Sequence, residues 1–345
     1  MKPFHSLVAL CLGLLIAGCG PKKDRLNLLI WSEYIDPSLI SQFEAEHNCQ
    51  VVVDLFEDPE SMIAKLAAGG TATYDIVVPS DTTLPAMVHQ GLLSPLRAEN
   101  IPNLRNLDPQ FTNAPFDPGN RYGAPVDWGT TGVYYRKSKG APMEVSWASF
   151  FDASRQTGAF LLIEDARACI GAALRYRGYS VNTTNSAELA VARDVLIEAK
   201  KRSLGFEGGT GCKNRVLSKG AAIAMAYSGD AMRGIKEDSE TSYFIPKEGT
   251  QIFVDLLSVP SHAPHRDLAE KFINFMLDAK ISAKFANLSG SAVPNRAALE
   301  FVDPAILSNP LIYPPKETMD RLEYIRDLGE ANKLYDEVWT VIKSK

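Results

Sequence analysis

Short runs of apolar residues alternate along the chain with segments whose apolar residues recur every three or four positions. The short runs predict buried strands at 28–30, 51–55, 74–78, 160–163, 221–227 and 251–259. The helical spacing predicts helices at 36–43, 61–68, 84–90, 186–201, 267–277, 281–287, 316–328 and 332–343. Because strand and helix alternate almost throughout, the pattern predicts α/β layers with mainly parallel sheets.

The first predicted strand is followed by Trp31, Ser32, Glu33 and Tyr34, and Asp36 is suited to cap the helix that comes next. In open α/β sheets, ligands bind at the carboxyl ends of the strands. A Trp and a Tyr beside a carboxylate suit a cationic amine, so this segment is a candidate ligand site. The alternative is that Trp31 and Tyr34 are core residues and that Glu33 interacts with the helix dipole.

Two later segments indicate a two-domain organisation, for which 345 residues are sufficient. Segment 125–136 joins a polar half to a strand-like half through Gly129 and Gly132, and we expect the chain to cross there into a second domain. Asp255 lies in the middle of the apolar strand at 251–259, where an unpaired carboxylate is unfavourable. A functional partner for Asp255 is therefore favoured.

The N-terminus has the layout of a secretory signal. Lys2 precedes an apolar segment at 7–16 that is too short to span a bilayer. The Ile-Ala-Gly-Cys that follows resembles a bacterial lipobox, which implies a signal peptide at 1–18, a lipidated Cys19 and a tether at 19–25. An ordinary signal with a chance cysteine is the alternative. No apolar run in the rest of the sequence reaches membrane length.

Several function classes are disfavoured. The formal net charge of −5 and the pI of about 5.7 give no reason to expect a nucleic-acid partner. The Gly-rich segment 207–214 matches neither a P-loop nor a dinucleotide fingerprint and is interpreted as a mobile loop. No hydrolase elbow and no metal-ligand spacing of histidines is present, so we expect neither an enzyme nor a cofactor or metal. A hydrolase that uses Asp165, Asp230 and Asp255 is the alternative from a different class.

The sequence from residue 26 to the end resembles the periplasmic polyamine-binding proteins, the spermidine/putrescine receptors of ATP-binding-cassette importers. The motifs that carry the resemblance are WSEY at 31–34, YDIVVPS at 74–80, WGTTG at 128–132, DAR at 165–167, GY at 178–179, PKEG at 246–249 and PN at 294–295. The resemblance implies a two-lobed periplasmic-binding-protein fold of type II, in which each lobe is a mainly parallel sheet flanked by helices and crossing strands form a hinge. It implies a lobe one at 26–132 and 255–296, a lobe two at 133–254 and 297–345, and a monomer that delivers its ligand to a permease.

The resemblance also implies a set of ligand-binding residues on both lobes. Aromatic walls would surround the methylenes of a polyamine and carboxylates would bind its ammonium groups. The implied set is Trp31, Ser32, Glu33, Tyr34, Ser80, Thr82, Asp165, Tyr227, Asp230, Phe253 and Asp255. Asp255 is the expected ammonium anchor, whereas Asp165 and Asp230 could instead be helix-capping residues.

Five positions depart from the family pattern. Ala168 stands where a Glu is expected, Ser291 where an aromatic is expected and Ile325 where an amide is expected, and Asp81 and Thr82 occupy a place where the spermidine branch has tyrosines. These departures imply fewer acids and a smaller aromatic wall, which suits a short diamine or an ω-amino acid such as 4-aminobutyrate.

A carboxylate on the ligand would require a cation, and Arg167 and Arg215 are the nearest candidates in the sequence. Cys49, Cys169 and Cys212 remain after the signal and the lipidation site, so at most one internal disulfide can form. The resemblance places Cys169 and Cys212 beside the same cleft. We therefore hypothesise a disulfide between them, worth about 3–4 kcal/mol in the chain-entropy model.

Overall fold

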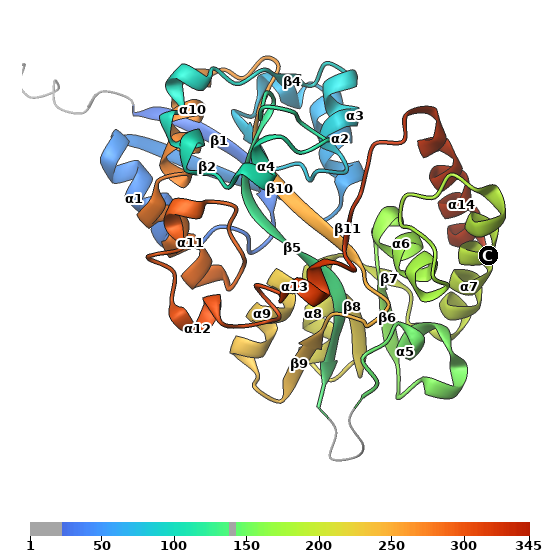
Figure 1. Cartoon of the computed structure of the whole chain (residues 1–345). Helices are drawn as coiled ribbons and strands as arrows, with labels where there is room; N and C mark the ends of the chain where they lie inside the picture. The colour runs from blue at the N-terminus through green and yellow to red at the C-terminus, as the bar shows by residue number, and fades with distance from the viewer. Residues whose placement is uncertain (1–22, 138–142) are drawn as a thin grey trace, which may run out of the picture.

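The computed structural model describes residues 23–137 and 143–345. The signal peptide predicted at 1–18 and the lipidation site predicted at Cys19 lie outside these ranges. Two α/β lobes lie on either side of a pair of long strands that run through both (Figure 1). We call the lobe that contains the first strands lobe one and the other lobe two.

Lobe one is built on the strand order β2-β1-β3, with helices on both faces. Its elements are β1 (Asp24–Trp31), β2 (Cys49–Phe56), β3 (Ile76–Val77), β4 (Leu93–Ser94), α1 (Pro37–His47), α2 (Pro59–Ala67), α3 (Leu84–His89), α4 (Pro109–Thr112), α10 (Arg266–Met276) and α11 (Ala279–Ser289). Along β1, Leu28 packs with Phe43 of α1, whereas Leu29 packs with Met62 of α2. The strand is therefore covered on both faces, which explains its continuous apolar run.

The first strand begins earlier than predicted. Asp24 and Arg25 already pair in parallel with Cys49 and Gln50 of β2. The tether predicted at 19–25 is therefore wrong for its last two residues, because the parallel ladder extends to the first residue of both strands.

Lobe two is built on the strand order β8-β6-β7. Its elements are β6 (Phe160–Ile163), β7 (Phe206–Glu207), β8 (Ile223–Tyr227), β9 (Thr241–Phe244), α5 (Ala148–Phe151), α6 (Ala166–Tyr176), α7 (Ser186–Arg202), α8 (Gly209–Leu217), α9 (Ser228–Glu237) and α14 (Asn332–Ser344). Leu162 packs with Leu174 and Leu196 of α6 and α7, and Leu161 packs with Val216 of α8 on the opposite face. Helices thus cover both faces of this sheet as well.

The strands β5 (Gly123–Arg136) and β10 (Gln251–Pro260) connect the lobes. They pair in antiparallel register, which places Asp127 directly opposite Asp255. The register shifts immediately after Asp255, so an irregularity marks the point where the two lobes meet. The crossing predicted at 125–136 thus lies within β5.

After α11 the chain continues on lobe one before it reaches its last helix. Val302 belongs to the apolar core that also contains residues of α1 and α10, and Ile306 packs against this core. The last helix, α14, packs instead on α6 and α7 of lobe two. The remaining short elements are α12 (Pro304–Leu307), α13 (Lys316–Met319), β11 (Glu323–Tyr324) and the 3₁₀ helices Gly70–Ala72, Ala98–Asn100, Pro102–Asn106, Ala153–Arg155, Arg296–Ala298 and Gly329–Ala331. The lobe boundaries inferred from the sequence stay a prediction.

Two predictions of local structure are wrong. The helix predicted at 316–328 ends at Met319, because Glu323 and Tyr324 instead form β11 against the start of β10. The mobile loop predicted at 207–214 is the end of β7 followed by the first residues of α8. Gly209 opens that helix close to Asp230, where a Cβ atom would lie 2.3 Å from a carboxylate oxygen, so no larger residue fits there.

The predicted Cys169–Cys212 disulfide is not formed. Both residues and Cys49 are buried free thiols. The Cys169 thiol donates to the carbonyl of Ile163 at 3.0 Å, and the Cys212 thiol donates to the carbonyl of Glu207 at 3.4 Å. Each sulfur therefore has a backbone partner of its own.

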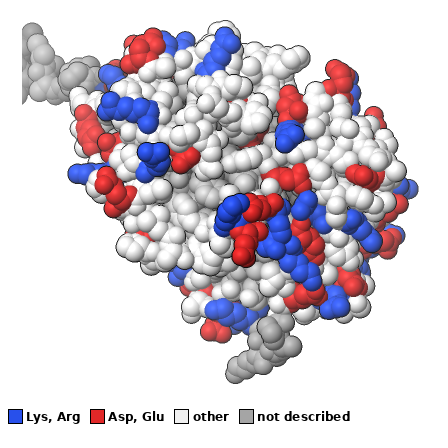
Figure 2. All heavy atoms as spheres, viewed as in Figure 1, with Lys and Arg blue, Asp and Glu red and all other residues white. Residues whose placement is uncertain are grey.

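Surface and helix properties add two observations. In residues 23–137 and 143–345, none of the helices combines the length and apolar character needed to cross a bilayer. Lys, Arg, Asp and Glu side chains are interspersed on the face shown in Figure 2, and where charges gather both signs are present. This face therefore offers no large patch of a single sign for a polyanionic partner.

Candidate functional site

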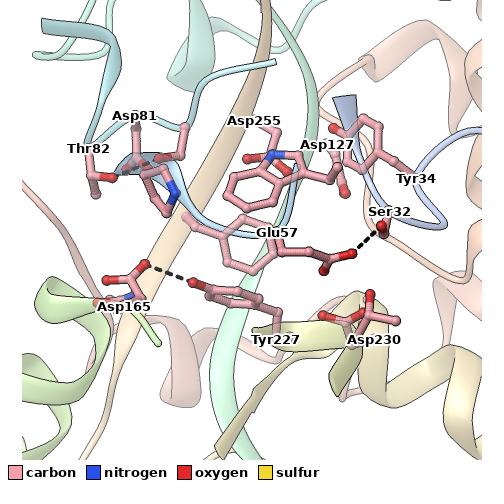
Figure 3. A pocket seen from close by; sticks show the side chains of 18 of the residues that line it. Ser32, Tyr34, Glu57, Asp81, Thr82, Asp127, Asp165, Tyr227, Asp230 and Asp255 are labelled. Carbon is pink, nitrogen blue, oxygen red and sulfur yellow. Dashed lines mark hydrogen bonds between the residues drawn. The ribbon is translucent and has the colours of Figure 1, made fainter. Parts of the chain in front are cut away.

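A cavity lies where the two lobes meet the crossing strands (Figure 3). Ten of the eleven ligand residues inferred from the sequence line it: Trp31, Ser32, Tyr34, Ser80, Thr82, Asp165, Tyr227, Asp230, Phe253 and Asp255. They come from the carboxyl ends of β1, β3 and β8, from the start of α6 and α9, and from β10. The strand-end loops thus converge on one space, as parallel sheets require.

Glu33 is the exception, because its side chain does not line the cavity. Its backbone adopts the left-handed conformation, with a φ of 53°. The carboxylate accepts a hydrogen bond from Lys213 of α8 at 2.6 Å and lies 3.7 Å from Arg233 of α9. Glu33 therefore joins lobe one to lobe two through an ion pair.

Asp165 caps a helix and also lies at the cavity. One carboxylate oxygen caps α6 by accepting from the backbone N–H of Ala168 at 2.8 Å, and the other accepts from the hydroxyl of Tyr227 at 2.8 Å. The cap fixes the carboxylate at the helix N-terminus while leaving it at the wall of the cavity (Figure 3). Asp81 and Thr82 lie at this same end of the cavity.

Asp127 is a site residue that sequence reasoning missed. It lies directly opposite Asp255, and both carboxyl groups are buried and line the cavity together with Tyr34. Burial, partly offset by Arg233, raises the pKa of Asp127 to about 8. Burial and the nearby charge of Asp127 raise the pKa of Asp255 well above its usual range. An acidic residue in mid-strand is the same signal that identified Asp255.

Asp81 adds a third buried acid. Its backbone N–H donates to the carbonyl of Val254 at 2.8 Å, which holds the loop after β3 against β10. Burial raises the pKa of Asp81 to about 8. Asp81 and Asp127 thus add two buried acids to those inferred from the sequence.

The cation at the cavity is Arg233 rather than either arginine proposed from the sequence. Arg167 stacks on Tyr335 at 4.2 Å, and Arg215 is paired with Glu207 on the surface; neither lines the cavity. Arg233 lies one helical turn after Asp230 and donates to its carboxylate at 2.6 Å. That pairing compensates the charge of Asp230.

Three further cavity residues with polar side chains were missed. Glu57 follows the end of β2, a strand-end position equivalent to that of Ser32 after β1, and accepts a hydrogen bond from Ser32 (Figure 3). Gln251 begins β10, and Thr210 lies in the first turn of α8. Glu57 could have been found from its place after a strand, whereas Thr210 lay in a segment predicted to be a loop.

The cavity contains buried polar atoms without a hydrogen-bond partner among the described residues. They are the indole N–H of Trp31, the hydroxyl of Tyr34, the Nε–H of Arg233, and one side-chain oxygen each of Asp81, Asp127 and Gln251. Such atoms are rare in native proteins. The Gln251 oxygen is an acceptor, and the Asp81 and Asp127 oxygens are acceptors when their carboxyl groups are ionised. The site is therefore suited to a ligand that carries several N–H donors.

The described residues contain no cluster of three or more His, Cys, Asp or Glu side chains arranged to hold a metal ion. Aromatic faces instead lie between the acidic groups, and Tyr227 packs edge-on against Phe253 with ring centroids 5.2 Å apart. The arrangement can enclose an apolar chain between charged ends.

Comparison with known proteins agrees with this geometry. Residues 38–312 match the model of the bacterial extracellular solute-binding protein family. The chain is 31% identical to the spermidine/putrescine-binding periplasmic protein of Escherichia coli, over 97% of this chain and 96% of that protein. It is 30% identical to the putrescine/cadaverine-binding protein of Pseudomonas aeruginosa, over 93% of this chain and 94% of that protein.

Solved structures give the same result. The crystal structure of the Tp0655 lipoprotein of Treponema pallidum superposes with a TM-score of 0.81 at 29% identity, covering 93% of this chain and 100% of that one. The spermidine/putrescine transporter substrate-binding protein of Streptococcus pneumoniae superposes with a TM-score of 0.77 at 29% identity, covering 93% and 99%. The two-lobed fold and the resemblance inferred from the sequence are thereby confirmed, and the chain belongs to the bacterial extracellular solute-binding proteins.

Proposed function

We propose that the protein captures a polyamine of the putrescine/spermidine class between its two lobes and delivers it unaltered to an ATP-binding-cassette permease. The observation that carries the proposal is the set of buried, unpaired acceptors at Asp81, Asp127 and Gln251 in a cavity walled by aromatic rings. The named relatives bind spermidine, putrescine or cadaverine, which supports the same ligand class here.

The physical basis is desolvation. An ammonium group that leaves water needs charge-assisted acceptors, and a ring face adds about 0.5–2 kcal/mol for each cation–π contact. The carboxylates of Asp255 and Asp165 supply acceptors at the two ends, and Trp31, Tyr227 and Phe253 supply apolar faces between them. A linear amine satisfies both requirements at once.

The location follows from the same proposal. A signal peptide at 1–18 and a lipid on Cys19 would hold a monomeric receptor at the membrane surface, in the periplasm or on the cell surface. The Treponema pallidum relative is named a lipoprotein, which supports the anchor. Binding and release require no covalent bond of the ligand to be made or broken, so we propose no catalytic role for the carboxylates.

A receptor for an ω-amino acid such as 4-aminobutyrate is the second candidate. It is favoured by one observation, the presence of the Arg233 guanidinium at the cavity. A ligand carboxylate would have to compete with Asp230 for that guanidinium, because a guanidinium N–H already donates to the Asp230 carboxylate at 2.6 Å. The polyamine is therefore preferred.

A thermal-denaturation screen of diamines, triamines and ω-amino acids tests the proposal. A cognate amine at one hundred times its Kd should stabilise the protein by about 2.7 kcal/mol. Mass analysis after incubation should recover the amine unaltered at one equivalent. Stabilisation by 4-aminobutyrate alone would favour the second candidate, and conversion of the amine would favour a hydrolase.

The ion pair between the lobes yields a further prediction. Lys213 is 1% exposed and donates to Glu33 of lobe one and to Glu237 of lobe two. Replacing Lys213 with Met keeps the buried stem but removes this link, so affinity for the amine should fall about 3- to 10-fold through faster dissociation. Stopped-flow fluorescence measures the rate.

Glu237→Gln is the matched control, because it removes a bond to Lys213 that lies within lobe two. Its dissociation rate should stay close to that of the wild type. Equal dissociation rates for Lys213→Met and the wild type would show that the ion pair does not hold the lobes together.

A further inference from the structure

Asp127 and Asp255 form an unusual pair on the crossing strands. They are directly opposite each other in the antiparallel ladder of β5 and β10, where side chains at paired positions have Cβ atoms about 4.5–5.5 Å apart. Their exposed fractions are only 5% and 7%, and both line the cavity. Two like charges at paired, buried positions destabilise a sheet, so this pair requires a compensating group.

The neighbouring elements do not fully provide one. The charged groups that face the pair are Arg233 and Asp230 on α9 and Asp81 after β3. The guanidinium of Arg233 is already engaged with Asp230.

The other neighbours of the pair are uncharged. They are the side chains of Tyr34, Ser291 and Tyr313. One oxygen of Asp127 is buried with no hydrogen-bond partner among the described residues. An additional positive group is therefore needed when both carboxyl groups are ionised.

A proton is the simplest such group while the cavity holds no amine. Burial, opposed by Arg233, raises the pKa of Asp127 to about 8, and burial together with the charge of Asp127 raises the pKa of Asp255 well above its usual range. The pair therefore retains at least one proton at neutral pH.

We propose that Asp127 and Asp255 act together as one ammonium seat, in which a primary ammonium group of the ligand replaces a proton shared by the two carboxyl groups. The inference rests on the proposed function and adds Asp127 as a specificity-determining residue. No covalent bond between heavy atoms changes: the carboxyl O–H breaks, its proton passes to solvent, and the ammonium N–H groups donate to the two carboxylates.

The seat also defines the ligand class. A terminal ammonium has three donors, which matches three oxygen-bearing side chains that line this part of the cavity together, those of Asp127, Asp255 and Tyr34. Asp81 and Asp165 form the other acidic end, while Asp230 is compensated by Arg233 (Figure 3). Two acidic ends, with Arg233 paired to Asp230 within α9 rather than to either end, favour an α,ω-diamine over a triamine.

Calorimetric titration of butane-1,4-diamine at pH 7, in buffers of different ionisation enthalpy, tests the inference. The wild type should release at least about one proton per diamine. Asp127→Asn should release about one proton fewer and bind the diamine about 10- to 100-fold more weakly, because a hydrogen bond to a charged group is lost. Asp320→Asn is the control for net charge, since Asp320 pairs with Lys316 on the surface, and should match the wild type.

The outcomes separate the two proposals. No binding of any amine by the wild type would contradict the proposed function. Binding without proton release by the wild type, or equal affinity and equal proton release in Asp127→Asn, would overturn the ammonium seat and leave the receptor function standing. Thermal denaturation of the ligand-free variant establishes that it is folded. Tighter binding of a triamine than of the diamine by the wild type would contradict the proposed preference for a diamine.

Discussion

Replacing Asp255 with Asn should weaken binding of the cognate amine by about 30-fold or more. Removal of one partner from a buried charge pair typically costs about 2–5 kcal/mol in binding. Asp255 is buried on the crossing strand, lines the cavity and lies directly opposite Asp127. Isothermal titration calorimetry with butane-1,4-diamine measures the loss.

The same substitution should stabilise the ligand-free protein. Asn at 255 removes the repulsion from Asp127 that helps to raise the pKa of Asp255. A higher Tm together with weaker binding would distinguish loss of a ligand contact from loss of the fold. Asp255→Asn with wild-type affinity would show that Asp255 is a structural residue that does not contact the amine.

The stability of the ligand-free protein should fall as the pH rises from about 5 to 8. Burial raises the pKa of both Asp81 and Asp127 to about 8, compared with about 3.9 in the unfolded chain. Between these values the folded state binds more protons than the unfolded state, so the free energy of unfolding decreases with pH. Each such group contributes up to about 1.4 kcal/mol per pH unit.

Bound amine should remove most of this dependence of stability on pH. In the complex its ammonium groups compensate the carboxylates, which lowers their pKa and cancels the difference from the unfolded chain. Affinity should accordingly increase from pH 5 to 8. Thermal denaturation with and without saturating amine measures both effects, and a ligand-free protein whose Tm rises over this interval would contradict the assignment of Asp81 and Asp127 as proton-binding groups.

Much of the architecture could be predicted because it depends on local signals. The apolar run at 28–30 and the pair Asp36 and Pro37 predict a strand followed by a capped helix, and the structure has β1, the cap bond from Ser38 and α1. The mid-strand position of Asp255 likewise indicated an acid with a functional partner, and Asp255 lies at the cavity.

The remaining features depend on contacts between distant segments. Asp127 becomes significant only because the register of β5 and β10 places it opposite Asp255, and spacing within one strand does not give that register. Glu33 turns away from the cavity because Lys213, 180 residues later, lies across the junction of the lobes. The prediction of a Cys169–Cys212 disulfide is wrong for a similar reason. Each thiol is directed toward its own backbone carbonyl partner, and the sequence does not show that contact.

The central claim is that the cavity encloses a small polycation. A crystal structure with butane-1,4-diamine tests it most directly. We predict one diamine between the lobes, with one ammonium within hydrogen-bond distance of Asp255 and Asp127 and the other at the end formed by Asp165 and Asp81. A diamine bound on the outer surface, or an anionic ligand held by Arg233 in this cavity, would contradict the account.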